Sequence, residues 1–106
     1  MKASEREALL KKAQPLERDI QAKILQYLRA KDIFHYKAIV SSKLGIPDII
    51  CCIDGRFVTL EVKRSERHKP TPMQIRVNQE IKQAGGDSYI VWSLDMVKEI
   101  IESYIH

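Results

Sequence analysis

A chain of 106 residues has room for one small domain and excludes a second domain of full size. Its formal net charge of +4 favours an acidic partner such as nucleic acid. The charged N-terminus and the lack of an apolar run of about 18 residues argue against a signal peptide and a membrane span, so we expect a cytoplasmic protein. The only cysteines, Cys51 and Cys52, are adjacent in a predicted strand and point to opposite faces, so we expect buried, reduced thiols.

The chain begins with a predicted helical extension over residues 1–14. Ser4 and Glu7 have the spacing of a capping box, and Pro15 ends this first helix. Pro15 is also well placed to open a longer helix that runs to about Ala30. The apolar stripe of this second helix consists of Leu16, Ile20, Ile24, Tyr27 and Leu28.

Two polar residues lie at or within that stripe. At about 100° per residue, Glu17 falls inside the stripe and Gln21 at its edge. A carboxylate that faces the core needs a partner there. The alternative is that Glu17 only favours the positive end of the helix dipole from the first turn.

The next segments predict a strand and then a hairpin. Residues 34–40 alternate apolar and polar side chains, as expected for a strand with one wet face. After a polar loop, two β-branched runs are joined by Asp54 and Gly55, which tolerate the positive φ angles of a tight type I′ turn. With these two as the loop, Asp48 lies directly opposite Glu61.

Opposed carboxylates are an unusual pair in a sheet. Their Cβ atoms are about 5 Å apart, where like charges destabilise the pairing, so a cation between them is expected. Lys63 lies two residues beyond Glu61, and alternation puts it on the same face as Asp48 and Glu61. This cluster suits a hard divalent ion, Mg²⁺ or Mn²⁺. Zinc is not expected, because the three histidines are scattered.

The remaining chain predicts a basic loop, a helix, a strand and a last helix. The loop spans residues 64–69, and the helix after it has Thr71 as its N-cap with Gln74 three residues later. A strand over 88–92 follows Gly85 and Gly86, and Ser93 caps a helix whose core face is Val97, Ile100, Ile101 and Tyr104. A strand that follows a hairpin through a helical crossover favours a parallel partner, so we expect an α/β fold with a mixed sheet.

The cluster predicts metal-dependent phosphodiester hydrolysis. A Mg²⁺ ion with few protein ligands keeps several waters, one of which becomes a nucleophile. Lys63 would orient that water or stabilise transition-state charge, and the basic loop would hold the phosphate backbone.

Four sequence elements also carry a family resemblance. Pro47-Asp48 followed after twelve residues by Glu61-Val62-Lys63 resembles the signature of PD-(D/E)XK nucleases. With Gly45-Ile46 before it, and with Thr71 to Gln74 and then Gly85-Gly86 after it, the pattern resembles a VRR-NUC domain from about Glu17 onward. The resemblance implies a restriction-endonuclease-like core with helices flanking a mixed sheet.

Carried over position by position, the resemblance implies a set of site residues. Asp48 and Glu61 would ligate the metal together with the Val62 backbone carbonyl, and Lys63 would be the catalytic lysine. Glu17 would be the acidic residue of the first core helix and a possible further ligand. Gln74 would reach the site, although it is explained equally well as the capping partner of Thr71.

The implied substrate is DNA. The residues expected to contact it are Lys43, Arg64, Arg67, His68, Lys69 and Arg76. Small stand-alone members of the family, from phages and bacteria, are thought of as dimeric enzymes of the Holliday-junction-resolving kind, so we expect a homodimer acting on branched DNA in the cytoplasm of a bacterial or phage-infected cell. The alternatives are a nucleic-acid-binding module without catalysis and a structural subunit whose hairpin carboxylates merely face solvent.

Overall fold

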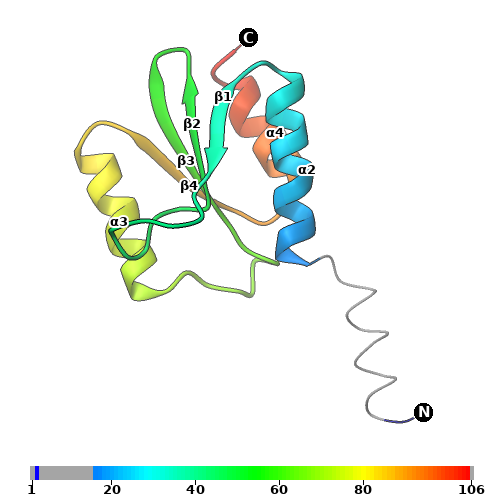
Figure 1. Cartoon of the computed structure of the whole chain (residues 1–106), viewed down its shortest axis with the longest axis vertical. Coiled ribbons are helices and arrows are strands. Elements are labelled where there is room, and N and C mark those ends of the chain that lie inside the picture. The colour runs from blue at the N-terminus through cyan, green and yellow to red at the C-terminus, as the bar shows by residue number, and fades with distance from the viewer. Residues whose placement is uncertain (1, 3–15, 106) are drawn as a thin grey trace.

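The computed structural model describes Lys2 and residues 16–105 (Figure 1). The expected helix before Pro15 therefore lies outside the described residues. Among those residues, no helix combines the length and apolarity that a bilayer crossing requires. The described elements are α2 (Glu17–Ala30), β1 (Phe34–Lys37), β2 (Ile49–Ile53), β3 (Arg56–Val62), α3 (Pro72–Gln83), β4 (Asp87–Val91) and α4 (Leu94–Glu102).

The four strands form one mixed sheet in the order β1-β2-β3-β4. β1 and β3 both run antiparallel to β2, and β4 runs parallel to β3 after the crossover through α3. The β2–β3 turn is the predicted one, with Asp54 at φ +50° and Gly55 at φ +80°. Ile53 pairs with Arg56 across it. The structure thus confirms the α/β class and the mixed sheet, in an arrangement consistent with a restriction-endonuclease-like core.

Helices cover the two faces of the sheet unequally. α2 and α4 pack side by side on one face, and α3 lies alone on the other (Figure 1). Alternate residues of β2 and β3 face α2 and α4, and their burial forms the main core. This core consists of Ile20, Ile24, Leu28, Ile49, Cys51, Ile53, Val58, Leu60, Val62, Val91, Val97 and Ile101.

Two expectations about β1 and β2 need correction. β1 ends at Lys37 instead of continuing to residue 40. Beyond its paired residues, a backbone hydrogen bond joins the Ala38 N–H to the Asp48 carbonyl oxygen at 2.8 Å. The apolar side chains Phe34 and Tyr36 are 70% and 52% exposed. They lie on the face that α3 leaves uncovered over β1. For the same reason only Cys51 is a buried thiol, and Cys52 is exposed.

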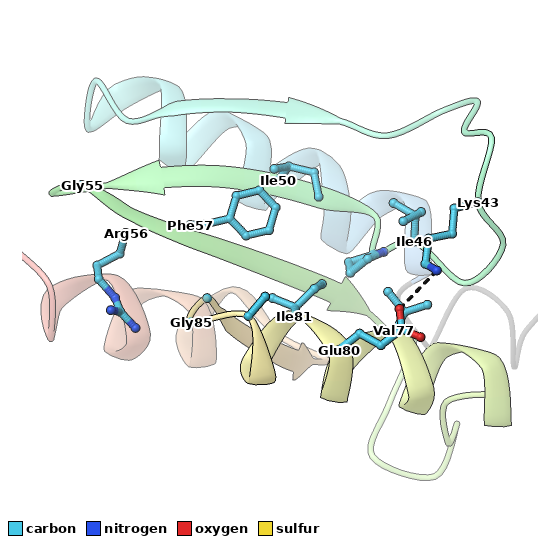
Figure 2. Close-up of a pocket in the computed structure, with 13 residues that line it drawn as sticks. Lys43, Ile46, Ile50, Gly55, Arg56, Phe57, Val77, Glu80, Ile81 and Gly85 are labelled. Atoms are coloured by element: carbon cyan, nitrogen blue, oxygen red, sulfur yellow. Dashed lines mark ion pairs between the residues drawn. The ribbon is translucent and has the colours of Figure 1, made fainter.

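The loop before β2 is anchored on α3. Gly45 adopts φ +80° and lies so close to the first turn of α3 that a Cβ there would be 2.7 Å from Met73 Cγ and 2.8 Å from its carbonyl oxygen. Lys43 Nζ also lies 3.1 Å from Glu80 Oε2 (Figure 2). Between α3 and the hairpin runs a groove of about 560 Å³, whose wall includes Ile50 and Phe57.

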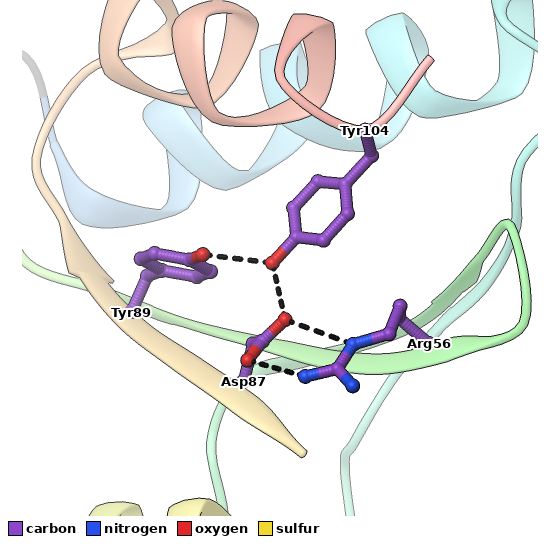
Figure 3. Close-up of polar contacts among 4 residues, drawn as sticks. All are labelled: Arg56, Asp87, Tyr89 and Tyr104. Carbon is purple, nitrogen blue, oxygen red and sulfur yellow. Dashed lines mark hydrogen bonds and ion pairs between the residues drawn. The ribbon is translucent and has the colours of Figure 1, made fainter. Parts of the chain in front are cut away.

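A cluster of polar side chains links Tyr104, which follows α4, to the sheet. Asp87, the first residue of β4, accepts hydrogen bonds from Arg56 Nη2 at 2.9 Å and from the Tyr104 hydroxyl at 2.6 Å (Figure 3). The Tyr89 and Tyr104 hydroxyl oxygens are 2.7 Å apart. Hydrogen bonding from Arg56 lowers the pKa of Asp87, so the carboxylate stays ionised. Tyr104 therefore packs against the sheet although α4 has already ended.

The contact between Gly45 and Met73 predicts the effect of a Cβ. We expect Gly45→Ala to lower the free energy of unfolding by about 2–4 kcal/mol, because it combines an unfavourable positive φ with a clash against helix backbone. Gly55→Ala is the matched control, since Gly55 also has φ +80° but a Cβ added there would meet nothing within 4 Å. Urea unfolding of both variants measures the difference. Equal destabilisation would show that the loop does not depend on this contact.

Candidate active site

The hairpin register sets the two central carboxylates opposite each other. Ile49 pairs with Leu60, so the next pair in the same register is Asp48 and Glu61. Asp48 lies just before β2, and its Oδ2 accepts a 2.7 Å hydrogen bond from the Val62 N–H. This bond holds the Asp48 side chain against the end of β3.

Glu61 is the most perturbed carboxyl group of the site. Its side chain is only 7% exposed, and burial, followed by the nearby charge of Asp48, raises its pKa to about 7. Lys63 acts in the opposite direction and lowers this pKa. Glu61 Oε2 is buried and has no hydrogen-bond partner among the described residues. The ionised form of this carboxyl group is therefore incompletely compensated by its surroundings.

Lys63 and Gln74 both approach the other oxygen of Glu61. Lys63 Nζ lies 3.6 Å from Glu61 Oε1, and its side chain is 12% exposed. Gln74 Nε2 donates a 2.8 Å hydrogen bond to the same oxygen. Oε1 is thus approached by an amide donor and an ammonium group, whereas the buried Oε2 has no hydrogen-bond partner among the described residues.

Gln74 fulfils both roles that its sequence position allows. As the capping residue of α3, its Oε1 accepts the Thr71 N–H at 2.9 Å, while its backbone N–H donates to Thr71 Oγ1 at 3.1 Å. Because the cap occupies the carbonyl end, the amide nitrogen is the end that faces Glu61. The helix cap thereby orients the donor toward the carboxylate.

Two polar residues of α2 that the sequence singles out differ in their burial. Glu17 is half-buried, and no hydrogen bond or ion pair between described residues joins it to Asp48, Glu61 or Lys63. Gln21, expected at the edge of the stripe, is instead 6% exposed, with Oε1 lacking a partner among the described residues. Helical periodicity put Glu17 inside the apolar stripe and Gln21 at its edge, but it could not tell which side of the stripe the sheet covers more fully.

The basic residues expected at DNA fall into two groups. Arg67, His68 and Lys69 are exposed in the loop after β3, and His68 Nδ1 lies 2.8 Å from Ser65 Oγ. Arg64, at the start of that loop, is half-buried, with Nε unpartnered among the described groups.

The second group lies by α3. Lys43 and Arg76 both pair with Glu80, at 3.1 Å and 3.6 Å. Their positive charge is partly neutralised, so the loop after β3 is the more strongly cationic surface beside Lys63.

The donor set fits a divalent cation. An unpartnered buried oxygen of Glu61 beside the carboxylate of Asp48 is an environment that a positive ion would stabilise. Within residues 16–105 no group of three or more histidine, cysteine, aspartate or glutamate side chains is placed to hold a metal. Two carboxylates supplemented by carbonyl oxygen and water are typical of Mg²⁺ rather than of a closed zinc site.

Known structures share this fold. No protein-family model matches the sequence, and neither does any curated protein. A solved structure described as a VRR_NUC domain is 27% identical, with a TM-score of 0.73, over 83% of this chain and 96% of its own. A second, a VRR_NUC domain protein, is 19% identical with a TM-score of 0.76, over 87% of this chain and 89% of its own. Together with the fold and its motifs, these similarities support a VRR-NUC domain and suggest a nuclease domain.

Proposed function

We propose that this nuclease domain is a metal-dependent DNA endonuclease that hydrolyses phosphodiester bonds in branched DNA. The observation that carries the proposal is the buried Glu61 carboxyl group, which faces Asp48 with one oxygen unpartnered and the other bound by Lys63 and Gln74. Groups with perturbed pKa values and converging donors are characteristic of catalytic sites.

Asp48 and Glu61 are the proposed ligands of Mg²⁺ or Mn²⁺, with the Val62 carbonyl oxygen as a third. The Val62 N–H points toward Asp48, and the N–H and C=O of one strand residue face the same side. When bound, the ion supplies a water of lowered pKa and neutralises charge on the phosphate oxygens. Glu17, in the first turn of α2, is proposed as a further ligand of the same ion.

Lys63 and Gln74 have separate proposed roles. The Lys63 ammonium group, held at Glu61 by its 3.6 Å ion pair, is placed to stabilise charge on the scissile phosphate or to orient the attacking water. Gln74 positions Glu61 through its 2.8 Å hydrogen bond. The exposed loop cations Arg67, His68 and Lys69, with Arg64, would hold the phosphate backbone beside these groups.

Branched DNA is the proposed substrate, and a homodimer is the proposed assembly. The described helices pack against the sheet, and none of them projects from it as a reader of base edges would. Selection by DNA shape is therefore favoured over selection by sequence. The site contains one carboxylate pair, so a homodimer is proposed to supply the second site that cutting two strands of a junction requires.

Removing the lysine tests the catalytic proposal. We expect Lys63→Ala to reduce cleavage of a four-way junction by at least about 100-fold, because the charge beside the scissile phosphate is lost. Duplex, flap, splayed and four-way DNAs of matched sequence, incubated with Mg²⁺ or Mn²⁺, report activity and preference on one gel. Lys98→Ala, on the opposite face of the sheet, is the control. Undiminished cleavage by Lys63→Ala would refute the assignment, and salt-sensitive binding without cleavage by the wild type would favour a non-catalytic module.

The raised pKa of Glu61 predicts a pH dependence of stability without metal. Between the ordinary value of 4.5 and about 7, the folded chain holds a proton on Glu61 that the unfolded chain releases. Rising pH across this window therefore lowers the free energy of unfolding, which levels off above it. We expect Glu61→Gln to lack this component, measured as the difference between wild-type and variant urea curves in EDTA. A difference that does not change with pH would contradict the buried, protonated carboxyl group.

The two functions of Gln74 can be separated by substitution. Thr71→Ala removes the hydroxyl from the cap and keeps the amide that reaches Glu61, so we expect about 1 kcal/mol of lost stability with cleavage nearly preserved. Gln74→Ala removes both contacts, and we expect a similar loss of stability together with about a 10-fold or greater loss of cleavage. Thermal unfolding and initial cleavage rates measure the pair. Equal rates for the two variants would reduce Gln74 to a helix cap.

A further inference from the structure

The single tryptophan of the chain lies at the end of the strand next to the candidate active site. Trp92 directly follows β4 and is 36% exposed. Tryptophan has a large, mostly apolar side chain, and such residues are highly buried on average in folded proteins. An indole that stays in contact with water at the edge of the carboxylate cluster is therefore a candidate for binding a ligand.

The strand register places Trp92 next to Lys63. Val62 pairs with Val91 in the parallel register of β3 and β4. The ladder continues beyond this pair, because the Lys63 N–H donates to the Val91 carbonyl oxygen at 2.8 Å. The next pair in the same register is Lys63 and Trp92, on strands that lie about 4.8 Å apart. The chain leaves β3 and β4 at the same end of the sheet (Figure 1).

Side-chain alternation puts both residues on the face that carries Glu61. Thr59 and Ser88 mark this face, since the Thr59 hydroxyl group donates to Ser88 Oγ at 2.7 Å across the two strands. Steps of two residues lead from Thr59 to Glu61 and then to Lys63. The same steps lead from Ser88 to Trp92. The indole therefore belongs to the same side of the sheet as the Lys63 ammonium group.

Trp92 is anchored through its backbone, and its ring is available. The Trp92 N–H contacts Met96 Sδ at 3.5 Å, which ties the residue to the first turn of α4. Within residues 16–105, the close pair of aromatic rings is Phe34 with Tyr36, and the contacts of lysine with a ring involve Tyr27. No ring or cation of this part of the chain therefore covers the indole, which leaves it open to a flat ligand.

We propose that Trp92 is a stacking platform for an unpaired nucleobase beside the phosphate that Lys63 contacts. The inference rests on the proposed function, in which Lys63 is placed at the scissile phosphate. Every base has a π face, so stacking on an aromatic side chain needs no readout of base edges. The site would thus bind DNA without regard to sequence.

Stacking on Trp92 favours bases that are not part of a continuous duplex. Inside a duplex, both faces of a base are covered by its neighbours, and exposing one face costs unpairing and unstacking energy. This cost is least for a base that is already single-stranded, as at a flap or a splayed branch. Trp92 would therefore recognise a feature that branched DNA has and that continuous duplex lacks.

The surrounding charges suit the backbone of the same DNA strand. Arg67, His68 and Lys69 are exposed in the loop that follows Lys63. A basic segment that follows the phosphates, next to an aromatic side chain on which a base stacks, is the usual combination in proteins that bind single strands. The loop and Trp92 would bind the backbone and the base, respectively.

The fluorescence of the single tryptophan tests the proposal in the wild-type protein. The titration is done in EDTA, so that the proposed metal-dependent cleavage does not occur, with flap DNA, splayed DNA and a duplex of matched sequence closed by hairpins at both ends. We expect saturating flap or splayed DNA to quench the indole emission at least about twofold more than the saturating duplex, because only the first two offer an unpaired base. Anisotropy of labelled DNA measures saturation independently.

Substitution of Trp92 tests the same site through affinity. Trp92→Leu keeps an apolar side chain without an aromatic face, and we expect it to bind flap DNA at least about 10-fold more weakly, with binding of the closed duplex nearly unchanged. Trp92→Phe keeps an aromatic ring and should restore most of the affinity. Phe34→Leu is the matched control, at a 70% exposed aromatic residue on the opposite edge strand of the sheet. Circular dichroism and urea unfolding verify that the variants fold.

Two results would overturn this assignment. One is an indole emission that changes equally with flap DNA and with the closed duplex at saturation. The other is a folded Trp92→Leu protein that binds flap DNA as tightly as the wild type does. Selective quenching in a protein that cleaves no DNA with any divalent ion would support the stacking site and refute the nuclease function separately. Cleavage with an unchanged substrate preference in Trp92→Leu would refute the stacking site and leave the nuclease function in place.

Discussion

The repulsion between two carboxyl groups at the end of one hairpin is the constraint on which the site depends. Asp48 and Glu61 occupy opposed positions, and burial of Glu61 makes their mutual charge more costly than it would be in water. The surrounding contacts each relieve part of this cost. Val62 donates its N–H to Asp48, whereas Lys63 and Gln74 bind Glu61 Oε1. What they leave unrelieved is concentrated at Glu61 Oε2, where a bound cation would be stabilised.

The elements around the site combine structural and chemical tasks in the same groups. The Thr71–Gln74 cap begins α3 and also directs an amide toward Glu61. Gly45 brings the loop before Asp48 against α3, where a larger residue would not fit. Stability and site geometry are therefore coupled here. This coupling explains why variants at these positions need measurements of both folding and cleavage.

Local patterns in the sequence predicted the hairpin and its consequences well. Asp54 and Gly55 specify the turn, and counting from it gives the observed register and the opposition of Asp48 and Glu61. The cap of α3 and the parallel β4 follow from equally local signals. The metal, the branched substrate and the role of each site residue stay predictions.

Features that depend on how layers cover one another were not predictable in the same way. Alternation in residues 34–40 indicates a strand, but not that its apolar side would stay uncovered because α3 packs on β4. Periodicity in α2 likewise put Glu17 inside the apolar stripe and Gln21 only at its edge. The docking of α2 on the sheet buried Gln21 instead. Both outcomes depend on contacts between segments that are distant in the sequence.

The candidate site is also compact along the chain. Asp48, Glu61, Lys63 and Gln74 all come from the single stretch β2–β3–α3, whereas α2 and α4 contribute the apolar packing behind the sheet. The groups of the candidate site and their mutual geometry are thus encoded by one contiguous segment of the chain. α2 and α4 therefore support the carboxylates only indirectly, through the sheet on which they pack.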